Sequence, residues 1–108
     1  MNLRKLTNMS DVRESVDLLD KMIVDLLSQR FELMENAAWL KLDRDQVLDI
    51  DRKMAVINNA KDYAREIGMG EIATNTVETI WHTLVNGCIN YEYQVHDELQ
   101  REKSLDNT

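Results

Sequence analysis

The sequence has no proline, only three glycines and a single cysteine, and each scarcity excludes a class of structure. Because proline and glycine mark most turns, a 108-residue chain with so few of them is expected to be all-helical. The lone cysteine, Cys88, excludes an internal disulfide and any Cys-x-x-Cys zinc or redox motif. No apolar run approaches the roughly 18 residues of a membrane span, so we expect no membrane segment.

Acidic residues outnumber basic ones, 20 against 13, and the formal net charge is -7. This balance argues against nucleic-acid binding, whose affinity depends largely on neutralised phosphates. It leaves an anionic small molecule open, because such a ligand responds to the few groups around it. The first ten residues carry cations without an apolar core. They do not resemble a secretory signal, so a cytoplasmic location is expected.

Apolar residues recurring every three or four positions predict three helices. The first, over residues 10–41 with Ser10 as its N-cap, has the stripe Val12, Val16, Leu19, Ile23, Leu26, Leu33 and Ala37. The second covers residues 49–67, has Met54, Ile57, Lys61 and Ala64 on one face, and is followed by Gly68 as its C′ residue. The third, residues 71–100, has the stripe Val77, Ile80, Trp81, Leu84, Cys88, Glu92, Val95 and Leu99.

These helices define one expected domain, residues 10–100, between flexible ends at residues 1–9 and 101–108, with a loop at 42–48. A first helix of about 32 residues is roughly 48 Å long. A compact chain of this size has a radius of gyration of only about 13 Å. One chain therefore cannot cover the first stripe, and we predict an intertwined homodimeric bundle. A simple antiparallel coiled-coil dimer would also satisfy this argument.

Charged residues interrupt two of the stripes. Arg30 occupies the step between Leu26 and Leu33, where an apolar residue is expected. Lys41 points nearly the same way about 16 Å further along the axis, so the two side chains could bracket a small ligand. Equally, Arg30 could snorkel out of the seam. Glu92 lies on the third stripe, where it pairs with a core cation, sets the register of packing, or belongs to a site; Arg30 is the candidate partner.

The histidines offer a weaker pattern. Glu78 with His82, and Glu92 with His96, stand four residues apart and could each share a metal ion. No third ligand is evident from the sequence, so we expect no metal site. The sequence also shows no Gly-rich phosphate loop and no Ser-His-Asp order.

The segment VRESVDLLDKMIVDLLSQRFEL, followed by LK, resembles the first helix of the all-helical chorismate mutases. That helix typically carries an arginine, an Ile/Val-Asp-x-Leu/Ile-Asp pattern, Leu-Leu-x-x-Arg, and a lysine eleven residues later. Here these are Arg13, residues 16–20, Arg30 and Lys41. VLDIDR, ending at Arg52, resembles the start of the family's second helix. The resemblance covers about residues 10–100.

The resemblance implies a homodimer with two active sites, a dianionic substrate, and no cofactor. By position, one site would be lined by Arg30, Lys41, Asp49, Arg52, Cys88 and Glu92. Arg13 would enter from the partner chain, which geometry supports, because it lies about 42 Å from Lys41 along one helix. Two arginines would clamp the carboxylates and Lys41 would donate to the ether oxygen. Glu92 could help there only when protonated, and the sequence leaves its protonation state open.

Three positions depart from the family pattern: Lys53 replaces a usual glutamate, Cys88 a frequent serine, and Glu92 a frequent glutamine. Isochorismate pyruvate lyases, a related branch, also lack the acidic residue at position 53. Three functions follow: a chorismate mutase of aromatic amino-acid (shikimate) biosynthesis, a lyase giving salicylate and pyruvate, and a non-catalytic dimerisation module. A mutase of 4-amino-4-deoxychorismate is less favoured, because Lys53 would lie near the substrate's ammonium group.

Overall fold

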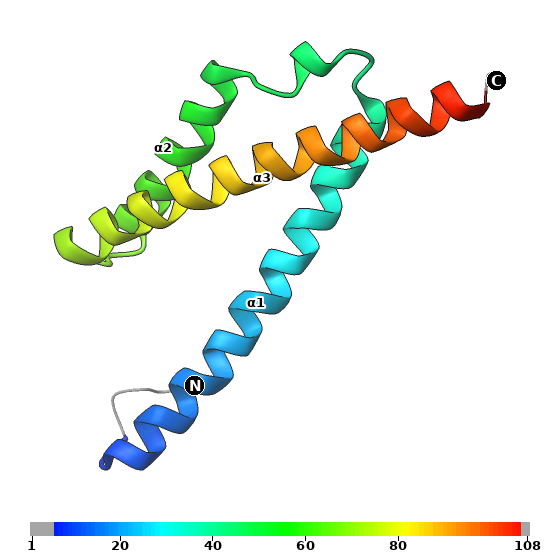
Figure 1. Cartoon of the computed structure of the whole chain (residues 1–108). Helices are drawn as coiled ribbons and strands as arrows, with labels where there is room; N and C mark the ends of the chain where they lie inside the picture. Colours follow the sequence, from blue (N-terminus) through cyan, green and yellow to red (C-terminus); the bar gives the residue numbers. More distant parts are fainter. Residues whose placement is uncertain (1–5, 107–108) are drawn as a thin grey trace. The chain divides into compact units, whose positions relative to one another are not determined.

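The computed structural model describes residues 6–106, and all regular structure in that range is helical (Figure 1). Helix α1 spans Met9–Leu40, the 3-10 helix η2 spans Arg44–Gln46, α2 spans Ile50–Glu66 and α3 spans Glu71–Asp106. The chain divides into two compact units, residues 1–33 and residues 34–108. The predicted all-α class with a long first helix is confirmed, and residues 6–106 contain no strand.

Asn8 caps helix α1, not Ser10 as predicted. The Asp11 amide donates to Asn8 Oδ1 (2.9 Å), and Asn8 Nδ2 donates back to Asp11 Oδ2 (2.8 Å). Asparagine and serine are about equally good N-caps, so an earlier asparagine can start the helix and leave the serine inside its first turn. The helix therefore begins at Met9.

The segment between α1 and α2 contains a short helical turn that the sequence did not predict. Gln46 Oε1 accepts hydrogen bonds from the amides of Leu42 (2.8 Å) and Asp43 (3.2 Å), which closes η2. Three residues are too few to show a hydrophobic period, so the sequence predicted a loop at this position. Helix α2 then begins where predicted, to within a residue, because Asp49 Oδ1 accepts from the Arg52 amide (3.0 Å).

Gly68 ends the second helix as predicted. Its φ of 81° lies in the left-handed region, where a residue without a Cβ has no steric penalty. The Gly68 amide donates to Arg65 O and the Met69 amide donates to Ala64 O, both at 3.1 Å. These two bonds form a Schellman motif. The chain reverses there, and α3 returns along α2 (Figure 1).

The core of the second unit is formed by residues of α1, α2 and α3 and by Val47, which follows η2. The buried side chains are those of Ala38, Val47, Ile57, Ala64, Thr74, Val85, Cys88, Glu92 and His96. The predicted face of α2 is confirmed at Ile57 and Ala64. On α3 the predicted stripe is confirmed at Cys88 and Glu92, but Val85 and His96 are buried outside it, whereas Ile80 is 49% exposed. A long helix with apolar residues on two adjacent rows does not reveal which row its neighbours cover.

Helix α3 continues to Asp106, so its predicted end at Gln100 is wrong. Residues 101–106 are mostly polar, but they include no glycine or proline that would break a helix. The rest of the predicted tail, like residues 1–5 of the predicted N-terminal segment, lies outside the described residues.

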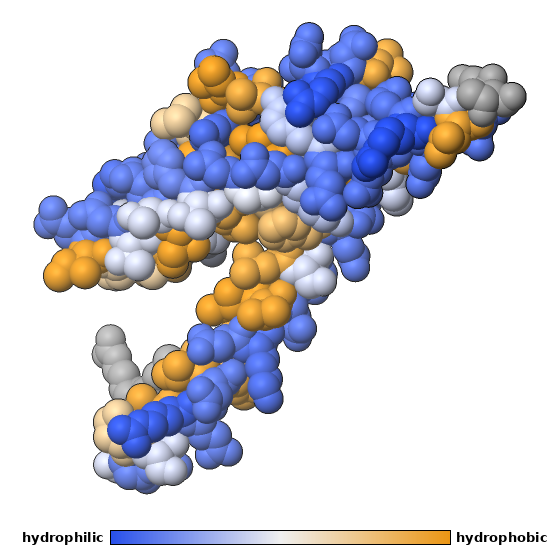
Figure 2. All heavy atoms as spheres, viewed as in Figure 1, coloured by the Kyte–Doolittle hydropathy of each residue, from blue (hydrophilic) through white to orange (hydrophobic). Residues whose placement is uncertain are grey.

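In the first unit, α1 carries its apolar stripe at the surface. None of residues 6–33 is buried. Five stripe residues are between 38% and 63% exposed: Val16, Leu19, Ile23, Leu26 and Leu33. Figure 2 shows apolar side chains along this stretch of helix. Despite its apolar stripe, neither this helix nor any other in residues 6–106 is long and apolar enough to cross a membrane.

Candidate functional site

A buried ion pair lies in the second unit, where the chain leaves α1 and passes the middle of α3. Lys41 Nζ is 2.6 Å from Glu92 Oε1. The Glu92 side chain is only 4% exposed, against 30% for that of Lys41. We predicted Arg30 as the candidate partner of Glu92, and the contact with Lys41 was missed. The structure thus pairs two of the three residues predicted to be catalytic.

Both the ammonium and the main chain of Lys41 have partners in the second unit. Its ammonium also donates to Val47 O (3.5 Å), and its backbone carbonyl lies 3.1 Å from Nε2 of the buried His96. Although the lysine and glutamate approach closely, Glu92 Oε1 has no well-aligned hydrogen bond. An ammonium carries three N–H donors. The pair can therefore present a fixed positive charge to a further oxygen atom without moving the backbone.

The other predicted residues of this unit divide into two groups. Cys88 lies one turn before Glu92 on the same face of α3 and is 2% exposed. Asp49 acts as the N-cap of α2, and Arg52 and Lys53 stand in the first turn of that helix. Arg52 is exposed and Lys53 is half-buried. Asp49 therefore has a structural role, whatever it contributes to a ligand.

Arg13 and Arg30 both lie on α1 in the first unit. Arg13 is exposed and Arg30 is half-buried. At 1.5 Å per residue their Cα atoms are roughly 25 Å apart along the helix axis. Two arginine side chains from one helix cannot both reach a ligand of a few ångströms across that distance.

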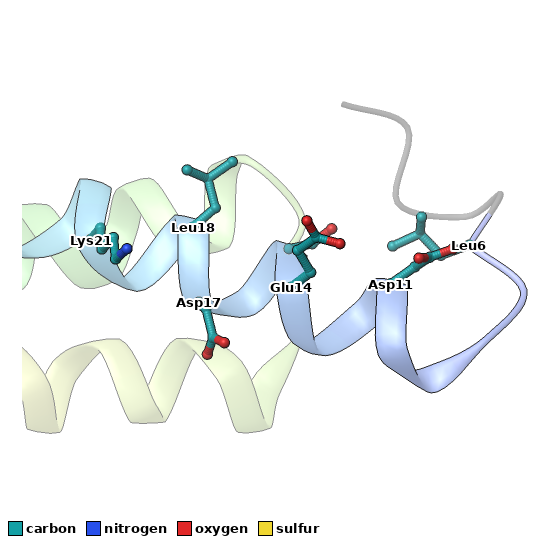
Figure 3. Close-up of a pocket in the computed structure, with 7 residues that line it drawn as sticks. Leu6, Asp11, Glu14, Asp17, Leu18 and Lys21 are labelled. Carbon is teal, nitrogen blue, oxygen red and sulfur yellow. The ribbon is translucent and has the colours of Figure 1, made fainter.

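Two surface hollows carry the wrong charge for an anionic ligand. The first, about 500 Å³, is lined by Leu6, Asp11, Glu14, Ser15, Asp17, Leu18 and Lys21 (Figure 3). Its lining includes three carboxylates and a single ammonium group. The second, about 490 Å³, is lined by Asp45, Gln46, Leu48, Asp49, Ile50 and Asp51. Three carboxylates without a cation would repel a dianion, so neither hollow is the candidate site.

Further contacts, which the sequence did not predict, stabilise the segment around Lys41. The Arg44 guanidinium lies 4.3 Å from the centre of the Tyr93 ring, and its Nε is 3.0 Å from Asp97 Oδ1. The Tyr91 hydroxyl donates to Glu35, which joins the last turns of α1 to α3. That hydrogen bond, with burial as a second cause, raises the pKa of Tyr91 above its usual 10.0. Tyrosines spaced two residues apart on a charged helix carry no sequence signal for these contacts.

The two predicted Glu–His pairs have other partners. Glu78 Oε2 lies 2.8 Å from Lys61 Nζ, and this contact between α2 and α3 lowers the pKa of Glu78 below 4.5. His96 faces the Lys41 carbonyl and Glu92 faces the Lys41 ammonium. Within residues 6–106, no three His, Cys, Asp or Glu side chains are grouped so as to hold a metal ion.

These features define a helical domain whose site offers a fixed ammonium beside a buried carboxyl group. The family model for chorismate mutase type II matches residues 12–93, which is most of the chain. The chain belongs to this family. No curated protein matches it significantly. The matched segment includes every residue predicted to line the site, from Arg13 to Glu92.

Proposed function

We propose that this protein is a chorismate mutase, which rearranges chorismate to prephenate. Two observations support the proposal: membership of the family and the Lys41–Glu92 pair at 2.6 Å. The reaction breaks the ether C–O bond and forms a C–C bond within one molecule, so it needs no nucleophile. The protein must hold the enolpyruvyl arm over the ring and stabilise negative charge on the ether oxygen.

Each cation has a distinct task in this proposal. Lys41 donates a hydrogen bond to the ether oxygen as the C–O bond breaks. Arg30 and Arg13 of the partner subunit bind the two carboxylates, since a guanidinium matches a carboxylate with two parallel hydrogen bonds. The remaining predicted residues, Asp49, Arg52, Lys53 and Cys88, contribute to binding the substrate. We expect no cofactor.

The shared site requires a homodimer. The exposed apolar stripe of α1 supports this, because burying such side chains stabilises by about 1.5–3 kcal/mol each. The separation of Arg13 and Arg30 on one helix supports it independently. Sedimentation at micromolar concentration should give twice the 12.6 kDa of one chain. A stable monomer would refute the shared site.

The decisive assay offers chorismate and isochorismate separately to the purified protein. Prephenate identifies a mutase, and salicylate with pyruvate identifies a lyase. Absence of turnover with both substrates favours a non-catalytic dimerisation module. The lyase is the second candidate because half-buried Lys53 replaces the mutases' usual glutamate. For the mutase we propose a place in cytoplasmic aromatic amino-acid biosynthesis.

Substitutions test the assigned roles. Arg30→Ala and Lys41→Ala should each lower kcat/KM by about 10²-fold, or about 2.7 kcal/mol of transition-state stabilisation. Lys103→Ala, an exposed cation of α3, is the matched control and should leave kcat/KM unchanged. Near-normal turnover in either site variant would contradict its role. Mixing Arg13→Ala with Lys41→Ala chains should restore activity, because one site of each heterodimer keeps both residues.

Glu92 is proposed as the neighbour of both the ether oxygen and the Lys41 ammonium, which lies 2.6 Å from its Oε1. An ionised carboxylate has no proton to donate and would repel developing negative charge. Glu92→Gln supplies a permanent donor of the same shape, so it should raise kcat/KM. A glutamine variant with no gain in kcat/KM would remove Glu92 from the ether oxygen.

A further inference from the structure

His96 is a buried imidazole that the proposed reaction does not use. It is 2% exposed and lies one helical turn after Glu92 on α3. Its Nε2 is 3.1 Å from the backbone carbonyl of Lys41. These two residues of α3 therefore contact opposite ends of Lys41. Glu92 contacts its ammonium, and His96 contacts its main-chain carbonyl.

The Lys41 carbonyl needs a partner from outside its own helix. Helix α1 ends at Leu40, although the Lys41 amide still donates to Ala37 O (3.2 Å). The last four carbonyls of a helix have no intrahelical donor, and leaving one unpaired in a buried position costs free energy. His96 supplies that donor from α3. The hydrogen bond therefore fixes where α1 ends relative to α3.

The geometry also selects one tautomer of His96. A carbonyl oxygen only accepts, so Nε2 must carry the proton that lies between them. The other ring nitrogen, Nδ1, is buried and has no hydrogen-bond partner among the described residues. A buried nitrogen without a partner is costly. An apolar side chain would avoid that cost, but it could not hold the Lys41 carbonyl.

We propose that His96 is a positioning residue, which holds the main chain of Lys41 so that its ammonium stands beside Glu92. The kinetic consequence rests on the proposed function, whereas the positioning itself does not. Lys41 has a flexible four-carbon side chain, so its ammonium is placed only if its backbone is fixed. Displacing a catalytic group by about 1 Å can cost up to 10²-fold in rate.

Three substitutions separate donation from packing. His96→Gln places an amide N–H near the Nε2 position, His96→Asn is too short to reach the carbonyl, and His96→Leu fills space without a donor. His82→Leu, an exposed histidine of the same helix, is the matched control. Per folded site, we expect kcat to fall at least 10-fold in the asparagine and leucine variants, with KM nearly unchanged. The glutamine variant should stay within about 3-fold of the parent.

A merely structural role would lower the melting temperature but leave kcat per folded site unchanged, and that result would overturn the proposal. If His96→Leu does not fold, the glutamine and asparagine variants decide, since both are polar. Equal kcat values in these two variants would also overturn it.

An NMR measurement tests the positioning without any substrate. In protein carrying 13C-labelled lysine, the Lys41 Cε signal is assigned by its loss in Lys41→Arg. This signal should shift in His96→Leu and His96→Asn, and stay in place in His82→Leu. Ring 15N shifts should show His96 protonated on Nε2. An unmoved Cε signal or a proton on Nδ1 overturns the proposal. If the parent converts neither substrate, the proposed function fails, and these spectra alone decide the positioning.

Discussion

Removing the charge of Lys41 should destabilise the fold more than removing that of Glu92. The two side chains share one contact of 2.6 Å but differ in access to water: 30% of the lysine side chain is exposed and 4% of the glutamate. Lys41→Met therefore leaves a carboxylate buried without a counter-charge. Glu92→Gln leaves an ammonium that can still turn toward solvent.

The difference in solvent exposure determines how much each substitution is expected to lower the free energy of unfolding. Breaking a buried ion pair from one side typically costs 3–5 kcal/mol, so we expect about 3 kcal/mol for Lys41→Met. The solvated ammonium in Glu92→Gln should cost only about 1 kcal/mol, the scale of one lost hydrogen bond. The double variant should also cost about 1 kcal/mol, because replacing a buried pair by neutral groups is often close to neutral. The coupling energy is then about 3 kcal/mol.

The assay is urea unfolding followed by helical circular dichroism at neutral pH. Protein concentration must be fixed, because subunit association contributes to the measured stability. The control cycle uses the ion pair of Arg44 and Asp97, whose side chains are 3.0 Å apart and 59% and 47% exposed. An exposed pair of this kind should couple by less than about 1 kcal/mol. Equal costs for Lys41→Met and Glu92→Gln, or a coupling no larger than the control's, would refute the reasoning.

Two further predictions concern other contacts of the second unit. Lys61 lowers the pKa of Glu78 below 4.5, so this carboxylate contributes stability that is present above pH 4.5 and lost as pH falls through the lowered value. Glu78→Gln should therefore make unfolding less pH-dependent below pH 4.5, measured by acid titration of the melting temperature; an unchanged profile would contradict the assignment. Gly68→Ala meets no atom within 4 Å but must adopt a φ of 81°, so it should cost roughly 1–2 kcal/mol in urea unfolding. Gly68→Asn should cost less, since asparagine tolerates this region, and equal costs would argue against backbone strain.

Sequence periodicity predicted the helices well where local chemistry defines a boundary, and poorly where it does not. Gly68 marks the end of α2 unambiguously, because the reversal there requires a positive φ. The predicted start of α1 was wrong because Asn8 and Ser10 are both good N-caps. Only the hydrogen bonds between Asn8 and Asp11 show which of them caps the helix. The predicted end of α3 was wrong because we interpreted the polar residues after Gln100 as a frayed tail. Polar residues without glycine or proline continue a helix readily.

The site shows the same division between what one helix reveals and what packing decides. Glu92 stood out because a carboxylate on an apolar row must be paired or functional, and the structure does give it a partner. The sequence could not name Lys41 as that partner. Periodicity gives the direction of a side chain around its own helix, but not which residue of another element lies opposite it.

His96, four residues after Glu92, was considered only as a metal ligand. Its actual contact is with a backbone carbonyl, a group that every residue has and that no sequence pattern distinguishes. The termination of α1 at Leu40 makes the Lys41 carbonyl available to His96. A lysine at the end of a helix therefore gains a defined position from two residues of another helix. That position is the requirement a donor to the ether oxygen must meet before any chemistry begins.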